Sequence, residues 1–472
     1  MSKKNHGGEL NKVLNTGDVL VVAFGAMIGW GWVVSSGQWI VSGGIIGTII
    51  GFIIGGLMIY FVGLCYAELT TAMPKCGGEH VFSYRAFGPI GSYICTWSII
   101  LSYIGVVCYE AVSFPTILQY LFPSMSKIYL YSICGFDVYL TWLLVAMAMA
   151  IIILFINIKG TKKAAKFQKV LTGIIAATGI MLVVGAVYSG NVDNVRNQMF
   201  VGNSNLKIFE NIIKVAIMTP FFFFGFDVIP QVAEEIKMPL KKLGKMMILS
   251  IIMAVTFYVF IVFAVGLVMD NKGISKSMSE TGLVTADAMA RAFNSTNMAK
   301  VLIIGGLCGI VTSWNSFLIG GSRALYSMAN SYMLPRKFGV LHKKHNTPVN
   351  ALLLIGSLSV ISPLFGRSML IWIVDAGNFA CCLAYCMVSL SFLILRKKER
   401  SMKRPYKVRN YKIVGTFAVI LSGSMAAMYI IPGTNCTMVW QEWIIVGGWT
   451  LLGLILAYLS KKKYKKNFAQ CH

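Results

Sequence analysis

Three glycines inside one apolar segment are the first residues in this sequence whose backbone groups could take part in chemistry. Gly25, Gly29 and Gly31 lie within the segment Val19–Ile40, which is long enough to cross a bilayer. Glycine loses backbone entropy in a helix, and an opened helix in hydrocarbon leaves N–H and C=O groups unsatisfied. The stretch Phe24–Trp32 therefore predicts a helix break whose backbone groups bind an ion or a ligand. Close helix packing through Gly25 and Gly29 is the alternative.

A second interruption of the same kind lies 196 residues further along, counted from Gly29 to Gly225. Here Pro220 and Pro230 bracket Gly225, and each proline removes a backbone donor and crowds the preceding turn. Asp227 lies near the middle of the same apolar span, where an ionisable residue is costly and marks a candidate functional site. The alternative role for Asp227 is to accept N–H groups at the broken helix end.

Membrane helices are the elements that must position these two breaks. The chain has 472 residues, of which 57% are hydrophobic and 12% charged, with a mean hydropathy of +0.71. A soluble domain carries about twice that charge. Apolar runs of about 20 residues recur, so we predict an all-α polytopic membrane protein with 12 transmembrane helices. The expected spans are 18–41, 44–67, 90–120, 138–158, 168–189, 208–236, 246–270, 298–330, 350–365, 368–395, 412–431 and 443–460.

The placement of the basic residues predicts the orientation. Of the 42 lysines and arginines, 33 lie in the two tails and in the segments on the same side as the tails. The positive-inside rule then assigns both termini to the cytoplasm of a multi-pass protein in the plasma or inner membrane. The net charge of +25 is accordingly expected to face anionic lipid, and nucleic-acid binding is not expected.

The two breaks divide the chain into repeats. Four spans follow each broken span, and five spans per repeat is an odd number, so the two halves enter the membrane from opposite sides. Paired broken helices in inverted halves indicate a transport site near the membrane midplane. The predicted segments are a cytoplasmic N-terminus at 1–17, inverted repeats at 18–190 and 208–396, two extra helices at 412–460 and a cytoplasmic tail at 461–472.

With these features in place, the sequence resembles an amino acid permease of the amino acid–polyamine–organocation (APC) superfamily, which has the LeuT-type fold. The resemblance covers nearly the whole chain. The motifs that carry it are Gly25–Gly31, Pro74–Glu79, Tyr84–Gly88, Phe224–Asp227, Glu234–Pro239 and Ser322–Ala329. It implies a secondary active transporter, a symporter or antiporter, that moves amino acids across the cytoplasmic membrane by alternating access.

The resemblance also implies a substrate site at the unwound centres of helices one and six. Backbone amides around Gly29, Trp30 and Gly31 would bind the substrate carboxylate, because a helix N-terminus concentrates unpaired donors. Carbonyl groups near the two breaks would accept from the α-ammonium group. The residues expected to bind substrate are Gly25, Ala26, Gly29, Trp30, Gly31, Phe221, Phe224, Gly225, Phe226 and Asp227.

An aromatic gate over the substrate is implied as well. Either Phe221 or Phe226 is expected to fill that role, and the other rings of this stretch would pack in the core or against lipid. Trp30 and Trp32 replace the smaller residues common in relatives, so they either shrink the pocket or anchor the helix.

Two embedded carboxylates, Glu110 and Asp227, are the candidates for coupling transport to an ion. Glu110 could recognise a cationic group, carry a proton or accept structural hydrogen bonds. Many proton-coupled relatives carry a lysine at the position equivalent to Ile175, and this chain does not. Thr312 and Ser313 instead resemble the hydroxyl pair that helps to bind sodium in LeuT-like proteins.

Carbonyl oxygens of Gly25 and Ile28 would complete such a sodium site, since a hard cation prefers oxygen ligands. The alternative is that Thr312 and Ser313 bond their own helix backbone. No bound cofactor is expected, and coupling to Na⁺ or H⁺ is left open, as are the identity of the amino acid, symport against exchange, and the oligomeric state.

The same residues bear on other function classes. The five histidines are expected in loops or tails and the embedded carboxylates are scattered, so the chain is not expected to be an enzyme. The nearest alternative is an amine or polyamine carrier, or an amino acid/amine exchanger, which two acids beside an aromatic pocket would suit. A non-transporting amino acid sensor and a channel are more remote alternatives.

Overall fold

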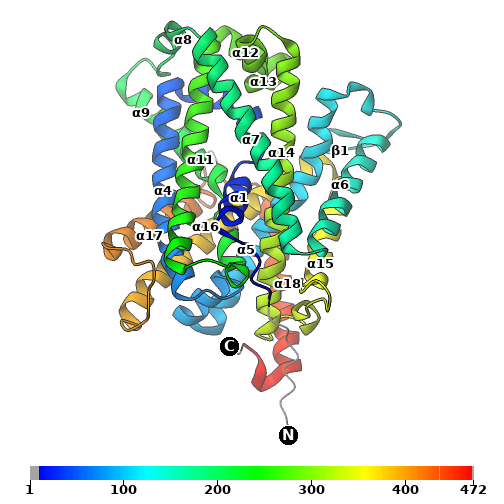
Figure 1. The fold of residues 1–472 in the computed structure, drawn as a ribbon, viewed down its shortest axis with the longest axis vertical. Helices are drawn as coiled ribbons and strands as arrows, with labels where there is room; N and C mark the ends of the chain where they lie inside the picture. The colour runs from blue at the N-terminus through cyan, green and yellow to red at the C-terminus, as the bar shows by residue number, and fades with distance from the viewer. Residues whose placement is uncertain (1–9, 435, 470–472) are drawn as a thin grey trace.

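The computed structural model describes residues 10–434 and 436–469 as a bundle of long helices (Figure 1). Eleven helices in this described part are long and apolar enough to cross a membrane, and the apolar helix Thr16–Met27 is shorter. The prediction of an all-α polytopic membrane protein is thus confirmed. The first predicted span is not among the eleven, because its helix ends at Met27 and the remaining segment is too short to cross a membrane alone. Residues 1–9 of the predicted N-terminus and 470–472 of the predicted tail lie outside the described residues.

The observed elements follow the predicted spans closely. The α-helices are α1 (Thr16–Met27), α2 (Gly31–Val34), α3 (Ser36–Gly43), α4 (Ile45–Ala72), α5 (Glu79–Leu121), α6 (Leu140–Ile158), α7 (Thr161–Ser189), α8 (Val192–Asn197), α9 (Asn205–Met218), α10 (Val228–Gln231), α11 (Leu240–Val268), α12 (Asn271–Glu280), α13 (Val284–Ala292), α14 (Thr296–Asn330), α15 (Val349–Ile361), α16 (Gly366–Lys398), α17 (Tyr411–Met428) and α18 (Trp440–Tyr464). Short 3₁₀ helices are η1 (Pro123–Met125), η2 (Thr219–Phe223), η3 (Ala233–Glu235), η4 (Arg336–Gly339), η5 (Ser362–Phe365) and η6 (Lys465–Asn467).

The sequence did not predict a small antiparallel hairpin between α5 and α6. Its strands are β1 (Tyr129–Ile133) and β2 (Phe136–Tyr139), and the turn contains Gly135 at a positive φ of 75°. A Cβ-free residue adopts that conformation without strain, which closes the turn. The hairpin lies at one side of the bundle and leaves the helical architecture unchanged (Figure 1).

Helix α14 forms the centre of the bundle. In the most apolar 18-residue stretch of α14, 94% of the residues are buried, whereas 11% are buried in the corresponding stretch of α18. A Cβ on Gly309 of α14 would lie 2.5 Å from the carbonyl oxygen of Gly29, so the two backbones approach closely. The central helix therefore positions the first break directly against its own small residues.

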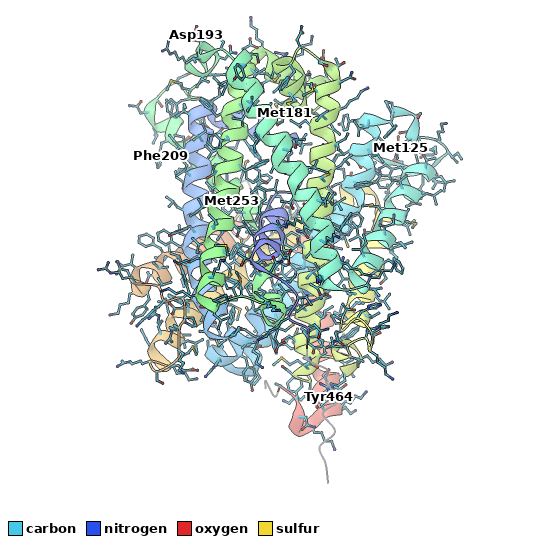
Figure 2. The ribbon with its side chains drawn as sticks, in the orientation of Figure 1. Met125, Met181, Asp193, Phe209, Met253 and Tyr464 are labelled. Atoms are coloured by element: carbon cyan, nitrogen blue, oxygen red, sulfur yellow. The ribbon has the colours of Figure 1, made fainter. Side chains whose placement is uncertain are left out.

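The bundle has two distinct ends. Figure 2 shows Asp193 of α8 at one end and Tyr464 of α18 at the other. The first described residues lie at the Tyr464 end, because Leu10 packs against Tyr326 near the end of α14. The Tyr464 hydroxyl accepts a hydrogen bond from the amide of Arg336, just beyond α14. The described chain therefore begins and ends on the same side of the bundle.

Candidate functional site

The first break separates α1 from α2. Helix α1 begins with a capping box in which Asn15 accepts from the amides of Gly17 and Asp18, and it ends at Met27. Helix α2 begins at Gly31. Within the described residues, the amides of Gly29, Trp30 and Gly31 donate no hydrogen bond. Three backbone donors are therefore left for a ligand.

The second break lies between η2 and α10. Phe224 is extended and Gly225 has a φ of +126°, which is a conformation that favours glycine. A Cβ on Gly225 would lie 2.7 Å from the Cβ of Ala26, so the two broken segments touch at this point. The carbonyls of Phe222 and Phe224 accept no hydrogen bond from the described part of the chain. They supply acceptors close to the donors of the first break.

Residues from both breaks line one inner cavity of about 170 Å³. It is lined by Ala26, Met27, Gly29, Trp30, Gly31, Val34, Ser35, Val106, Tyr109, Glu110, Phe221, Phe222, Phe224, Tyr258, Ser313, Phe317 and Val374. Of the ten residues expected to bind substrate, this set contains Ala26, Gly29, Trp30, Gly31, Phe221 and Phe224. Unpaired amides, apolar walls and a carboxyl group therefore meet in one small space.

An outer hollow of about 390 Å³ adjoins the inner cavity. The two spaces share six lining residues, which lie between them: Ser35, Tyr109, Phe221, Phe222, Phe224 and Val374. The ring of Phe221 lies 5.1 Å from that of Phe222 and 6.2 Å from that of Phe224, measured between centroids. Gly31 permits this packing, because a Cβ there would lie 2.4 Å from the Phe222 ring. The cluster is a partition between the cavity and the hollow.

Glu110 of α5 reaches the inner cavity at the first break. Its side chain is 6% exposed, and its Oε1 atom would lie 3.3 Å from a Cβ on Gly29. Ser313 of α14 stands beside the same glycine, with its Cβ at 3.8 Å from that point. Every other lining residue is uncharged. A carboxyl group at this depth needs a counter-ion, a proton or hydrogen-bond donors.

Asp227 is placed outside the lining of the inner cavity, in a buried cage of donors. Its carboxylate accepts from the hydroxyl of Tyr103 at 2.6 Å, from the hydroxyl of Tyr385 at 2.7 Å and from the amide of Gly225 at 2.9 Å. These contacts tie the second break to α5 and α16. The amide of Gly225 is the kind of donor that the N–H-accepting alternative expects, whereas the other two donors are tyrosine hydroxyl groups.

Phe226 also points away from the inner cavity. It is fully buried, and its ring lies 5.3 Å from Tyr66 and 5.5 Å from Tyr385, measured between centroids. Gly25 and Gly225 do not line the cavity. Each lies where a neighbouring segment packs too closely to leave room for a side chain. Of the two phenylalanines expected as gate, Phe221 is therefore the one that lies between the two spaces.

The four residues of the expected sodium site do lie close to one another. The Cβ of Thr312 is 3.2 Å from the point where a Cβ on Gly25 would stand, and a Cβ on Gly309 would lie 3.0 Å from the Ile28 carbonyl oxygen. Thr312 donates its hydroxyl proton to the carbonyl of Gly309 at 2.9 Å, three residues earlier in α14, which is the backbone bond expected in the alternative reading. Among the described residues, the buried hydroxyl of neighbouring Thr172 has no partner. The structure thus places these residues near one another, and the sodium site itself stays a prediction.

One sequence expectation about histidine is wrong. His80 lies in the first turn of α5 and is fully buried, because its ring nitrogens find hydroxyl partners. Nε2 is 2.8 Å from the Ser331 Oγ and Nδ1 is 2.9 Å from the Ser92 Oγ. It does not line the inner cavity, and no group of three or more potential metal ligands occurs among the described residues.

Sequence reasoning missed several cavity residues. Tyr109, Tyr258 and Phe317 come from α5, α11 and α14, and nothing in the local sequence marks Tyr258 or Phe317. The Tyr258 hydroxyl donates to the carbonyl of Met27 at 3.1 Å, at the last residue of α1. The position of Tyr109 next to Glu110 was the one signal available, because a neighbour of an embedded carboxylate lies at the same membrane depth.

Comparison with known proteins decides the family. Residues 14–456 match the amino acid permease family. This chain belongs to the amino acid permease family. Like its family, the permease is a transporter and not an enzyme. The match spans all the elements that build the cavity, from α1 to α16.

Named relatives cover most of the permease. A branched-chain amino acid permease, BcaP, of Bacillus subtilis is 25% identical over 97% of this chain and 94% of its own length. A methylthioribose transporter of the same organism is 24% identical, covering 98% of this chain and 96% of its own length. An Asc-type amino acid transporter 1 from Mus musculus is 24% identical over 84% of this chain and 73% of its own length.

Proposed function

We propose that this permease moves an amino acid across the membrane by alternating access and binds it in the inner cavity. The observation that carries the proposal is that both helix breaks contribute to one cavity. The unpaired amides of Gly29–Gly31 suit a carboxylate, and the unpaired carbonyls of Phe222 and Phe224 suit an ammonium group. The two repeats at 18–190 and 208–396 would each supply one broken helix.

The side chain of the proposed substrate is apolar. Met27, Val34, Val106, Phe317 and Val374 line the cavity beside its aromatic residues. Apolar pockets of this kind select by size and shape. The relative named as a branched-chain amino acid permease supports the same substrate class. We therefore assign leucine, isoleucine, valine and smaller neutral amino acids as the candidate substrates.

A second candidate, an amine carrier or amino acid/amine exchanger, is favoured by the acids along the path. Glu110 lines the inner cavity and Asp375 lines the outer hollow. A carboxylate facing the path attracts an ammonium group without requiring a substrate carboxylate. The two candidates differ in whether the carboxylate of the substrate is needed for binding.

Uptake by purified permease in proteoliposomes distinguishes them. Labelled leucine is offered with unlabelled leucine, leucine methyl ester or isopentylamine, the amine that leucine leaves on decarboxylation. We expect leucine to compete, and the ester and the amine to compete at least about tenfold less well, because neither presents a carboxylate to the amides of Gly29–Gly31. Equal competition by the amine would reject the amino acid proposal and favour the amine carrier.

The proposed coupling group is Glu110. No lysine, arginine or histidine lines the inner cavity, so this carboxyl group has no cationic side chain beside it there. We assign a proton as its counter-ion, taken up from one side and released to the other. Coupling by Glu110 would differ from the lysine-based scheme of many proton-coupled relatives, because this chain has isoleucine and not lysine at position 175.

Glu110→Gln is therefore expected to abolish accumulation of substrate driven by a proton gradient and to leave exchange of internal for external substrate in place. The amide fills the same volume but binds no proton. The measurement is uptake into proteoliposomes with an imposed pH gradient, compared with counterflow at equal pH. Gln38→Asn, in the outer hollow, is the control and should retain both activities.

Sodium is the alternative coupling ion. If accumulation follows a sodium gradient and is lost in Thr312→Val with Ser313→Ala, then coupling belongs to the site formed with Gly25 and Ile28, and Glu110 does not carry it.

Both described chain ends lie on one side of the bundle. We assign that side to the cytoplasm, since it carries the excess of basic residues.

A further inference from the structure

A basic hollow of about 460 Å³ lies far from the transport cavity, between the end of α16 and the start of α17. It is lined by Arg396, Lys397, Arg400, Met402, Arg404, Lys407 and Tyr411. Five of these seven residues are cationic, and no acidic residue is among them. The transport function described above makes no use of this space.

Two of the arginines are held in fixed positions by one buried carboxylate. Glu68, near the end of α4, has a side chain that is 1% exposed. Its Oε2 accepts from the Nη2 of Arg396 at 2.5 Å, and its Oε1 lies 3.1 Å from the Nε of Arg404. Arg404 also donates to the backbone carbonyls of Leu395 and Glu399. These contacts hold the guanidinium groups of Arg396 and Arg404 in place at the wall of the hollow.

The remaining positive charge has no acidic partner among the described residues. The buried Nε of Arg396 makes no hydrogen bond with any described residue. No hydrogen bond or ion pair joins the side chains of Lys397, Arg400 or Lys407 to residues that the structure describes. The nearby carboxylate of Glu399 is taken by Arg85, at 2.8 Å.

Burial lowers the pKa of Arg404 from its ordinary value, and the neighbouring Arg396 acts in the same direction against the pull of Glu68. Arginine stays protonated at physiological pH, so Arg396 and Arg404 remain two positive charges crowded against one carboxylate. An anion in the hollow would relieve that crowding.

We propose that this basic hollow binds a phosphate group. Guanidinium groups recognise phosphate oxygens through paired N–H donors, and ammonium groups add point charges around them. The phosphate of an anionic lipid is one source, because Ile413, Phe417 and Ile420 on α17 expose an apolar surface that continues from this end of the helix. A soluble phosphate compound is the other source.

The test uses the purified full-length permease in a neutral detergent. Its melting temperature is followed while phosphatidylglycerol, phosphatidylcholine or sodium pyrophosphate is added. We expect phosphatidylglycerol to raise the melting temperature saturably and phosphatidylcholine to have no comparable effect. The double variant Arg400→Gln with Lys407→Gln should need at least about tenfold more phosphatidylglycerol to reach half of the maximal rise in melting temperature. These two side chains form no ion pair with any residue that the structure describes, so we expect their loss to spare the fold.

The matched control removes two charges elsewhere on the same side. Lys461→Gln with Lys462→Gln, in the last turn of α18, should respond like the unaltered chain. Protection by phosphatidylglycerol that pyrophosphate competes away supports the site with lipid as its source. Protection by pyrophosphate alone supports the site with a soluble source. Equal weakening in both double variants, or no protection by either ligand, would overturn the proposal.

Discussion

Replacing Gly225 by alanine is expected to abolish transport. At φ +126° an alanine is strained, at a cost of about 1–3 kcal/mol. Its Cβ would also lie 2.7 Å from the Cβ and 2.8 Å from the carbonyl carbon of Ala26, and a backbone atom cannot rotate away. The two breaks would be pushed apart, which adds about 1–3 kcal/mol for overpacking. The measurement is substrate uptake together with the melting temperature of the purified variant.

The matched control for that experiment is Gly448→Ala in α18. A Cβ at Gly448 meets no atom within 4 Å, and alanine favours a helix over glycine, so its uptake and melting temperature should be unchanged or slightly improved. Normal uptake by Gly225→Ala would mean that contact between the two breaks does not build the transport site.

The second large effect is expected from Arg323→Met at the Tyr464 end of the bundle. Arg323 of α14 and Glu235 of η3 form a buried ion pair, with Nε 2.9 Å from Oε1 and side chains that are 1% and 3% exposed. Thr161 joins both, accepting from the Nη2 of Arg323 at 2.6 Å and donating to the Oε2 of Glu235 at 2.5 Å. Losing the arginine leaves a buried carboxylate without its cation, which costs about 3–5 kcal/mol.

This pair also anchors the start of the described chain. The carbonyl of Glu235 accepts from the amides of Val13 and Leu14. We therefore expect Arg323→Met to lower the melting temperature strongly and to expose the N-terminal segment to protease. The double variant Arg323→Met with Glu235→Met should recover much of the lost stability, because an apolar pair replaces the buried charges. A double variant less stable than Arg323→Met would contradict this account of the pair.

The positions of the two breaks were predictable from the sequence. Glycine and proline act on the backbone at their own positions, so Gly29, Gly31, Pro220 and Gly225 mark interruptions without any knowledge of the fold. Span lengths were predictable for a similar reason, since bilayer thickness sets the number of apolar residues. The expectation that Trp30 and Phe221 line one cavity came from the family resemblance and not from these local signals.

What lies across from a residue could not be predicted in the same way. Asp227 accepts hydrogen bonds from Tyr103 and Tyr385, which are 124 and 158 residues away in the chain. The sequence around each tyrosine has the pattern of an ordinary apolar helix. Whether a carboxyl group lines a cavity or is caged by hydroxyl groups depends on such distant contacts. Glu110 and Asp227 therefore look alike in the sequence and differ in the structure. The buried His80 is hidden by the same limitation, because Ser331 lies 251 residues beyond it.

The most direct test of the central claim is whether substrate occupies the inner cavity. Val106→Cys places a thiol in that cavity, and Ile371→Cys places one in the outer hollow alone. Each purified variant is treated with a small thiol reagent, with and without the amino acid that gives the highest uptake, and the unaltered chain supplies the background from native cysteines. We predict that the substrate slows alkylation of Val106→Cys at least about tenfold and leaves Ile371→Cys unchanged. Protection of Ile371→Cys without protection of Val106→Cys would contradict the assignment of the substrate to the helix breaks.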